Sequence, residues 1–120
     1  MEMKTFKFKS FGGYEVTFDQ NVFTIHYAGQ KKLFSKAKPR TQMIELADIK
    51  AVDYKEPGKI QEGFVRFLTD RNEQYLSSVY MARHDIDSFI VETDEWPQVE
   101  KLFELIRKRK NVPFNKQKMM

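Results

Sequence analysis

The chain has 120 residues, enough for one domain with a hydrophobic core and too few for two. A hydrophobic share of 41%, with 14% aromatic residues, argues against disorder along the whole chain, and the lack of cysteine excludes disulfides, zinc–thiolate sites and thiol catalysis. The formal net charge is +4, but the basic residues are concentrated in two places, which argues against a globally basic nucleic-acid binder.

The N-terminal segment lacks the features of an export signal. Residues 1–8 alternate charged and aromatic side chains and contain no apolar stretch of the kind found in a secretory signal. No apolar run reaches the roughly 18 residues that a membrane-spanning helix needs. We therefore expect a soluble, cytoplasmic protein.

The first part of the chain predicts a strand followed by a β-hairpin. Residues 5–11 alternate in polarity, with a slip near the end, and the glycines at 12–13 allow a turn or a bulge. Residues 14–18 and 22–27 alternate as two strands, and the polar residues 19–21 form the turn between them.

The middle of the chain predicts a long loop and further strands. Residues 28–41 are polar and basic and form a loop or an irregular strand pair, and residues 42–46 form the next strand. The apolar pattern shifts after 47–48, so a turn or bulge separates this strand from the segment that follows. Three more strands are expected at 63–68, near 74–79 and at 87–92.

One amphipathic helix is expected from Glu95 to about Arg109, with Thr93 or Asp94 as its cap. Lys110 would fall on the apolar stripe, so the amphipathic pattern ends there. Strands followed by one late helix indicate a small barrel or sandwich with an end-cap, and not an alternating α/β enzyme. The stripe consists of Trp96, Val99, Leu102, Phe103 and Ile106.

Four segments of the chain carry a resemblance to a known family. They are residues 11–16 (FGGYEV), 22–25 (VFTI), 44–52 (IELADIKAV) and 63–67 (GFVRF). Together with the late helix, they resemble the bacterial pleckstrin-homology-like (PH-like) family over most of residues 6–108. The resemblance implies a mainly β fold, a bent seven-stranded barrel or orthogonal sandwich capped by the C-terminal helix. We expect a single domain at 1–110 and a flexible basic tail at 111–120.

Two basic clusters are the candidate binding residues. The loop cluster lies in a stretch without acids, and it is either an anion-binding loop or a solvated one. The tail cluster contacts an anionic surface or simply complements the helix dipole. The residues are Lys31, Lys32, Lys36, Lys38 and Arg40 in the loop, and Arg107, Lys108, Arg109 and Lys110 in the tail.

No segment carries a recognisable catalytic or metal-binding pattern. Residues 84–87 (HDID) bring an imidazole close to two carboxylates, but the only other histidine is His26, so a polar turn is the better interpretation. Ser77 and Ser78 have no nucleophile-elbow context. We therefore expect no catalytic residues, no cofactor, no metal and no small-molecule substrate.

The sequence thus favours a non-enzymatic binding or assembly module. Such a module would engage a protein partner, or its own copies, through strand edges and loops. The alternative is an anion-surface binder that recognises acidic lipid or nucleic acid through the loop and tail clusters.

Overall fold

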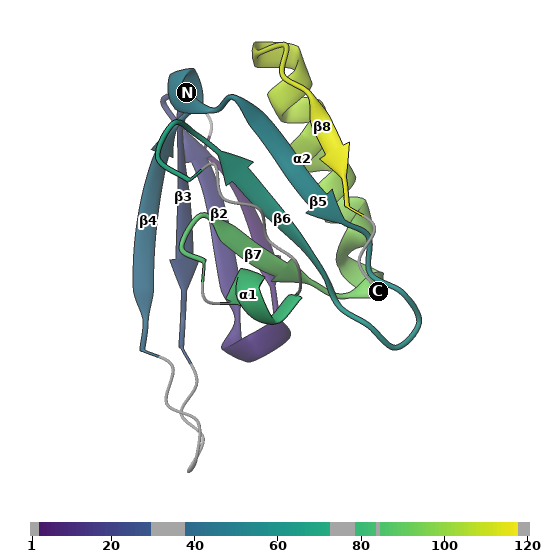
Figure 1. The fold of residues 1–120 in the computed structure, drawn as a ribbon. Coiled ribbons are helices and arrows are strands. Elements are labelled where there is room, and N and C mark those ends of the chain that lie inside the picture. The colour runs from purple at the N-terminus through teal and green to yellow at the C-terminus, as the bar shows by residue number, and fades with distance from the viewer. Residues whose placement is uncertain (1–2, 30–37, 73–78, 84, 118–120) are drawn as a thin grey trace.

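The computed structural model forms two four-stranded sheets and a C-terminal helix (Figure 1). The structure describes residues 3–29, 38–72, 79–83 and 85–117. The first sheet has the antiparallel order β1-β2-β3-β4, and the second has the order β7-β6-β5-β8. The strands are β1 (Lys4–Phe8), β2 (Tyr14–Asp19), β3 (Val22–Tyr27), β4 (Arg40–Glu45), β5 (Ala51–Lys55), β6 (Gly63–Leu68), β7 (Ser88–Val91) and β8 (Phe114–Lys116), and the helices are α1 (Val79–Arg83) and α2 (Trp96–Arg109).

The predicted hairpin of β2 and β3 is confirmed, with Asp19 paired to Val22. The two residues between them, Gln20 and Asn21, have φ angles of 51° and 64°. Positive φ at both central positions defines the type I′ turn, whose twist matches that of the flanking strands. The alternating residues of both strands therefore put one face toward the core and the other toward solvent.

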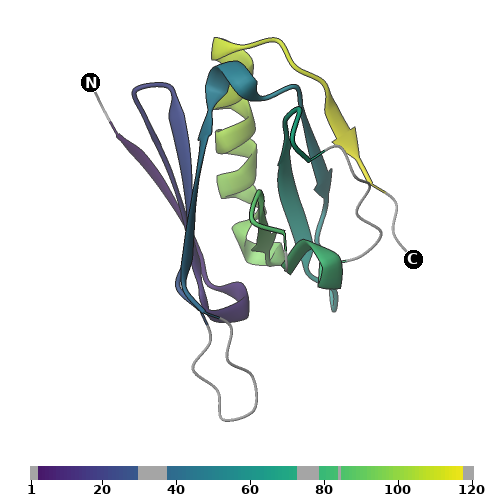
Figure 2. The same cartoon turned by 60° about the vertical axis from the view of Figure 1, so that its left-hand side comes forward.

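The second sheet is covered on both faces, so its strands do not alternate. Residues 63–67 of β6 and all four residues of β7 are buried. Helix α1 packs against β6 and β7. Figure 2 shows the first sheet and α2 on the opposite side of the second sheet from α1. The continuous apolar run of β6 follows from this double coverage.

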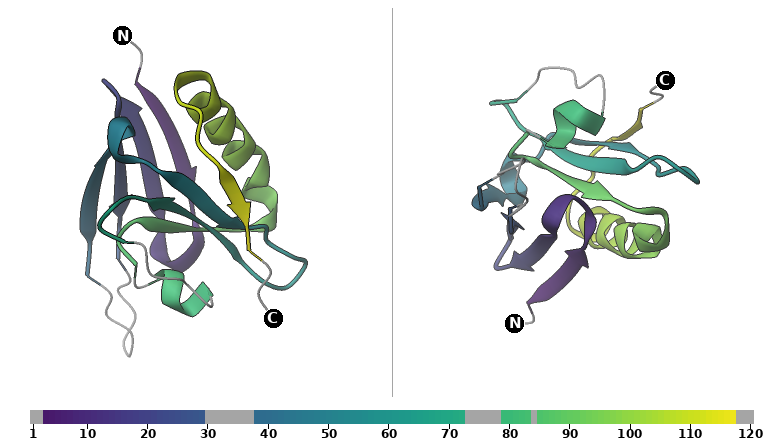
Figure 3. Two further views of the ribbon diagram at one scale, coloured as in Figure 1. Left: turned by 45° about the horizontal axis from the view of Figure 1, so that its top comes forward. Right: turned by 90° about the horizontal axis from the view of Figure 1, so that it is seen from below.

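Helix α2 has the predicted apolar stripe, with Val99, Leu102, Phe103 and Ile106 buried. The predicted cap, Thr93 or Asp94, is wrong. A 3-10 turn at Thr93–Glu95 precedes the helix, and Glu92 and Glu95 form a capping box in which the Glu95 carboxylate accepts the Glu92 N–H at 2.9 Å. Figure 3 shows α2 beside β1 on one side and β8 on the other, so the helix fills the opening between the sheets.

A chain of aromatic rings crosses the core from one sheet to the other. The ring centroids of Phe23 in β3 and Phe67 in β6 lie 5.2 Å apart, and those of Phe67 and Phe89 lie 6.2 Å apart. Phe89 in turn lies 4.7 Å from Phe8 of β1. These contacts join β1, β3, β6 and β7 in one hydrophobic core.

Gly63, the first residue of β6, packs directly against the backbone at the end of β5 and the start of the β5–β6 connection. A Cβ atom at this position would lie 2.0 Å from the carbonyl oxygen of Lys55 and 2.7 Å from the nitrogen of Pro57, both backbone atoms that cannot move independently. We expect Gly63→Ala to lower the free energy of unfolding by about 3 kcal/mol, the upper end of the usual cost of overpacking. Gly58→Ala is the matched control, because nothing lies within 4 Å of its added Cβ. Urea denaturation measures both, and equal midpoints would contradict the prediction.

The structure corrects the expected end of the domain. Residues 111–120 were expected to form a flexible tail, but Phe114–Lys116 form β8, which pairs in parallel with β5. Val112 is buried, and the Val52 N–H donates to the Pro113 carbonyl at 2.9 Å. The edge of β5 and the ring of Phe103, 4.8 Å from that of Phe114, hold this segment in place.

Three other expectations change in detail. The strand expected near 74–79 lies outside the described residues except for Val79, which begins α1, and β6 pairs with β5 and β7. The strand expected at 42–46 begins at Arg40 and ends before Leu46, which belongs to a 3-10 turn. The mainly β fold with a C-terminal helix is confirmed. The eight described strands, however, form two sheets that are not closed into a barrel, because no ladder among the described residues joins them.

The described part of the chain includes no helix that is both long enough and apolar enough to cross a membrane.

Candidate functional site

The structure places Arg40 of the loop cluster and the tail cluster at opposite ends of the first sheet. Arg40 pairs with Tyr27 at one end of the β3–β4 ladder. At the other end, the Leu46 N–H donates to the Asn21 carbonyl, and Lys110 donates to the Leu46 carbonyl at 3.2 Å. A single compact anion therefore cannot contact both Arg40 and the tail cluster. Lys31, Lys32 and Lys36 lie outside the described residues, and Lys38 is exposed.

Arg40 is part of the fold at its end of the sheet. Its guanidinium lies 4.7 Å from the centroid of the Tyr27 ring and donates to the carbonyl oxygens of Arg83 at 2.9 Å and Asp85 at 3.4 Å. Arg83 itself forms an ion pair with Glu62. These contacts tie β4 to the segment between α1 and β7.

The basic end of α2 has similar internal contacts. The guanidinium of Arg107 lies 4.3 Å from the centroid of the Phe114 ring, and that of Arg109 lies 5.2 Å from the centroid of the Phe18 ring. The Lys110 ammonium also donates to the Ala47 carbonyl at 2.7 Å. Lys108 is exposed. A surface hollow of about 480 Å³ lies here, lined by Asn21, Leu46, Ala47, Lys108, Arg109 and Lys110.

A second hollow, of about 370 Å³, lies between the β5–β6 connection and the start of α2. The Thr93 hydroxyl donates to the Gly58 carbonyl across its floor at 2.5 Å, and Ile60 on its rim is almost fully exposed. Its lining includes Lys59 together with Glu62, Glu92 and Asp94, so it carries charges of both signs.

Sequence reasoning missed a buried polar network centred on Arg66. The Arg66 side chain is only 3% exposed, and its Nε donates to the Asp85 carboxylate at 3.2 Å. Its Nη2 donates to the Asn72 carbonyl at 2.7 Å. The hydroxyl of Ser88 donates to the same Asp85 oxygen at 2.5 Å. An arginine inside an otherwise apolar strand was the available signal.

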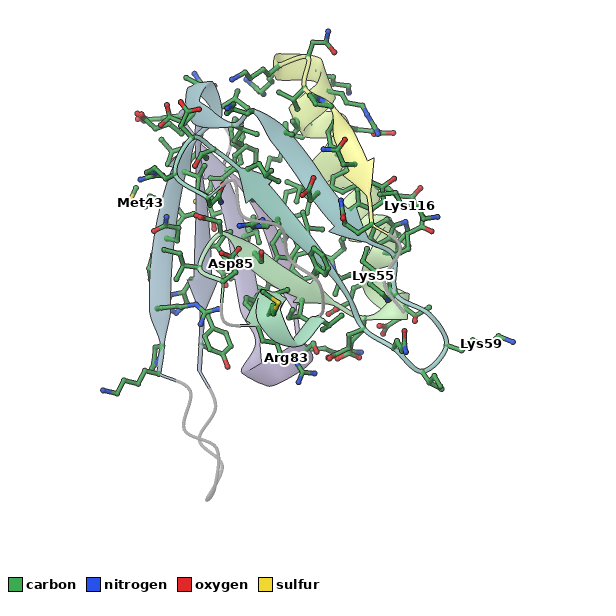
Figure 4. All side chains as sticks on the ribbon, in the orientation of Figure 1. Met43, Lys55, Lys59, Arg83, Asp85 and Lys116 are labelled. Carbon is green, nitrogen blue, oxygen red and sulfur yellow. The ribbon has the colours of Figure 1, made fainter. Side chains whose placement is uncertain are left out.

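Asp87 extends this network to the first sheet. One carboxylate oxygen accepts from the side chain of Asn72 at 2.7 Å, and the other accepts from Gln42 of β4 at 2.9 Å. The 84–87 segment was predicted to be a polar turn, and its two carboxylates serve as internal hydrogen-bond acceptors. Figure 4 shows Asp85 within the fold near α1 and β7.

Tyr14 carries a buried hydroxyl that has no hydrogen-bond partner among the described residues. Its ring lies 4.9 Å from that of Tyr27. Burial raises the pKa of this hydroxyl well above its usual value, and the nearby Arg40 offsets only part of that effect. The neutral form is thus favoured in the folded state more strongly than in the unfolded chain.

We expect Tyr14→Phe to leave stability at neutral pH unchanged or slightly increased, because it removes an unpaired buried polar group. The pKa of the Tyr14 hydroxyl is higher in the folded state than in the unfolded chain. The contribution of this hydroxyl to the free energy of unfolding is therefore complete below about pH 10 and is lost as the pH rises above that value. The variant should therefore lose less stability than the wild type between about pH 9 and pH 11. Urea midpoints measured across this range test the prediction, and parallel curves would contradict it.

The backbone of the first sheet distinguishes its two edges. Asp19 and Val22 close a two-residue hairpin and therefore form a hydrogen-bonded pair. From that point along the ladder, hydrogen-bonded pairs alternate with non-hydrogen-bonded pairs. In β1 and the residue after it, the backbone N–H and C=O groups that point away from β2 are therefore those of residues 5, 7 and 9. Helix side chains cover two of them: Gln98 bonds to the Lys7 N–H at 3.3 Å and to its carbonyl at 3.0 Å, and Glu95 accepts the Lys9 N–H at 2.8 Å.

The same alternation leaves the outer edge of β4 open. Residues 40, 42 and 44 bond to β3, so the outward N–H groups belong to Thr41, Met43 and Glu45. None of these three has a backbone partner on that side within the part of the chain that the structure describes. Their side chains are exposed, Met43 by 64%. Figure 4 shows Met43 at the outer margin of the sheet.

Comparison with known proteins gives one match. A family model described as a domain of unknown function (DUF4429) matches residues 16–106, from β2 to the last turns of α2. No curated protein and no solved structure matches the chain. Because the matched residues cover more than half of it, the chain belongs to the DUF4429 family.

Proposed function

We propose that this chain is a non-enzymatic binding or assembly module that engages a protein through the outer edge of β4. The observation that carries the proposal is the contrast between the two edges of the first sheet. The side chains of Gln98 and Glu95 bond to the outward backbone of Lys7 and Lys9, whereas the outward backbone of β4 has no partner among the described residues. An open edge of this kind is a template for an additional strand.

The composition of β4 supports this role. Natural edge strands are commonly protected by lysine, proline, a bulge or a very short length. β4 has six residues in regular register with β3, and it contains neither lysine nor proline. The residues whose N–H groups point outward are Thr41, Met43 and Glu45, and of these only Glu45 has a charged side chain. Such an edge is suited to pairing with another chain.

The PH-like assignment is part of the same proposal. Seven strands in two packed sheets, followed by a helix that fills the opening between them, support it. A scaffold of this type serves many ligands, so the function is argued from β4 and not from the fold. The anion-binding alternative has less support, because Arg40, Arg107 and Lys110 already have internal contacts and Arg40 lies at the opposite end of the sheet from the tail cluster.

The experiment places a photoactivatable amino acid at position 43 of the full chain in intact cells. We expect a covalent adduct with a protein from position 43 and none from position 7, an exposed site on β1 whose outward N–H and carbonyl are both bonded to Gln98. Glu45→Pro should abolish the adduct, because proline removes an outward N–H. Glu45 has a φ of −74°, which proline adopts without strain.

Glu45→Ala is the matched control, because it removes the same charge and keeps the N–H. The adduct should persist in this variant. Either the absence of any adduct from position 43, or equal loss in the proline and alanine variants, would overturn the proposal.

A further inference from the structure

We infer that the occupant of the β4 edge is a second copy of this chain, paired antiparallel so that Met43 lies opposite Met43 of the other copy. The inference rests on the proposed function and specifies its partner. It makes one continuous eight-stranded sheet from the first sheets of two molecules, with a two-fold axis through the Met43 pair.

The register follows from the outward backbone groups. Antiparallel strands exchange hydrogen bonds between directly opposed residues whose N–H and C=O face each other. When the outward residues 41, 43 and 45 meet their counterparts around a two-fold axis, Thr41 lies opposite Glu45 and Met43 lies opposite itself. Every outward N–H of β4 then finds an acceptor. The two exposed methionines contact each other on the same face of the joined sheet.

The charges along β4 select the antiparallel orientation. The exposed Lys38 precedes the strand, and the exposed Glu45 and Asp48 lie at its other end. Antiparallel pairing sets the basic start of one strand beside the acidic end of the other. Parallel pairing would set like charges side by side, which is destabilising. The edge is thus electrostatically complementary to a second copy of itself.

The area buried between the two β4 strands determines the affinity that we expect for the dimer. One pair of six-residue strands buries less than the 1,200–2,000 Å² that is typical, as a rough range, of stable complexes. We therefore expect a reversible dimer whose population rises with concentration, measurable by light scattering across a dilution series.

Single-cysteine variants test the register, since the chain has no cysteine of its own. Directly opposed Cα atoms in a hydrogen-bonded pair are about 5.5 Å apart, within disulfide range. We expect Met43→Cys to form a disulfide dimer under mild oxidation. Thr24→Cys is the control: Thr24 is next to Met43 in the same row, and two such cysteines would lie about 14 Å apart, three strand spacings, in the joined sheet.

Cysteines at 41 and 45 complete the test. Thr41→Cys and Glu45→Cys should each fail to link alone, and a mixture of the two should form the mixed dimer. Equal linking at 24 and 43, or a light-scattering monomer at every concentration, overturns the inference. If a monomeric chain still gives an adduct of a different mass from position 43, the proposed function stands and only the second-copy inference fails. If position 43 gives no adduct, both fail.

Discussion

Replacing Phe67 with alanine is expected to lower the free energy of unfolding by about 3–5 kcal/mol. Phe67 is fully buried in β6, an inner strand of the second sheet. Its ring stacks on Phe23 of the first sheet and packs against Phe89 of β7. Truncation removes the ring that joins these two aromatics and leaves a cavity between the two sheets.

The size of this effect follows from the position of Phe67. A domain of this size is stable by about 5–15 kcal/mol, so the variant loses a large share of the total or does not fold. Phe67→Leu keeps most of the volume and should cost only about 1–2 kcal/mol. Guanidinium denaturation of both variants measures the difference. A loss in the alanine variant no larger than that in the leucine variant would contradict the prediction.

The hairpin and the helix could be predicted because their signals are local. Asp19 to Val22 is a polar turn between two alternating segments, and the stripe from Val99 to Ile106 has helical spacing. In both, the residues that decide the structure are neighbours along the chain. The positions of these elements followed the sequence to within about two residues, the usual uncertainty of element ends.

Other features depend on residues far apart in sequence, and local patterns do not contain them. β8 has three residues, and its pairing partner in β5 lies about sixty positions earlier. Arg66 lies nineteen positions before its carboxylate partner Asp85. The open edge of β4 depends on the order of strands in the sheet, which no pattern within residues 40–45 specifies. The candidate site was therefore accessible only once the topology was known.

Replacing Asp85 with alanine is expected to cost about 3–5 kcal/mol, because it removes a carboxylate that pairs with the buried guanidinium of Arg66. The Ser88 hydroxyl loses its acceptor in the same variant. The cost comes mainly from the weaker stabilisation of the buried guanidinium charge, and not from the intrinsic strength of the ion pair. Removing that charge as well should therefore restore stability. We expect Arg66→Met combined with Asp85→Ala to be more stable than Asp85→Ala alone.

Asp70→Ala is the matched control for burial. The distance from Lys50 Nζ to Asp70 Oδ1 is 2.8 Å, shorter than the 3.2 Å between Arg66 and Asp85, but Asp70 is largely exposed. Removing it should produce no measurable change, because water solvates the remaining ammonium. Urea denaturation of these three variants and of the wild type forms the test. If Asp70→Ala costs as much as Asp85→Ala, or if the double variant is the least stable, the buried charge is not the cause.

The Asp85→Ala variant also tests whether the network that stabilises the fold is needed for pairing at the β4 edge. Arg40 and Gln42 of β4 reach the 83–87 segment through the Arg83 carbonyl and the Asp87 carboxylate, so this segment holds the inner side chains of the edge strand. The outward N–H groups of residues 41, 43 and 45 form no hydrogen bond with the described residues of this segment. If Asp85→Ala still folds, we expect the disulfide from Met43→Cys to form as before, because the pairing groups are set by the β3–β4 ladder. Loss of that disulfide in a folded Asp85→Ala chain would show that the network, and not the ladder alone, positions the edge.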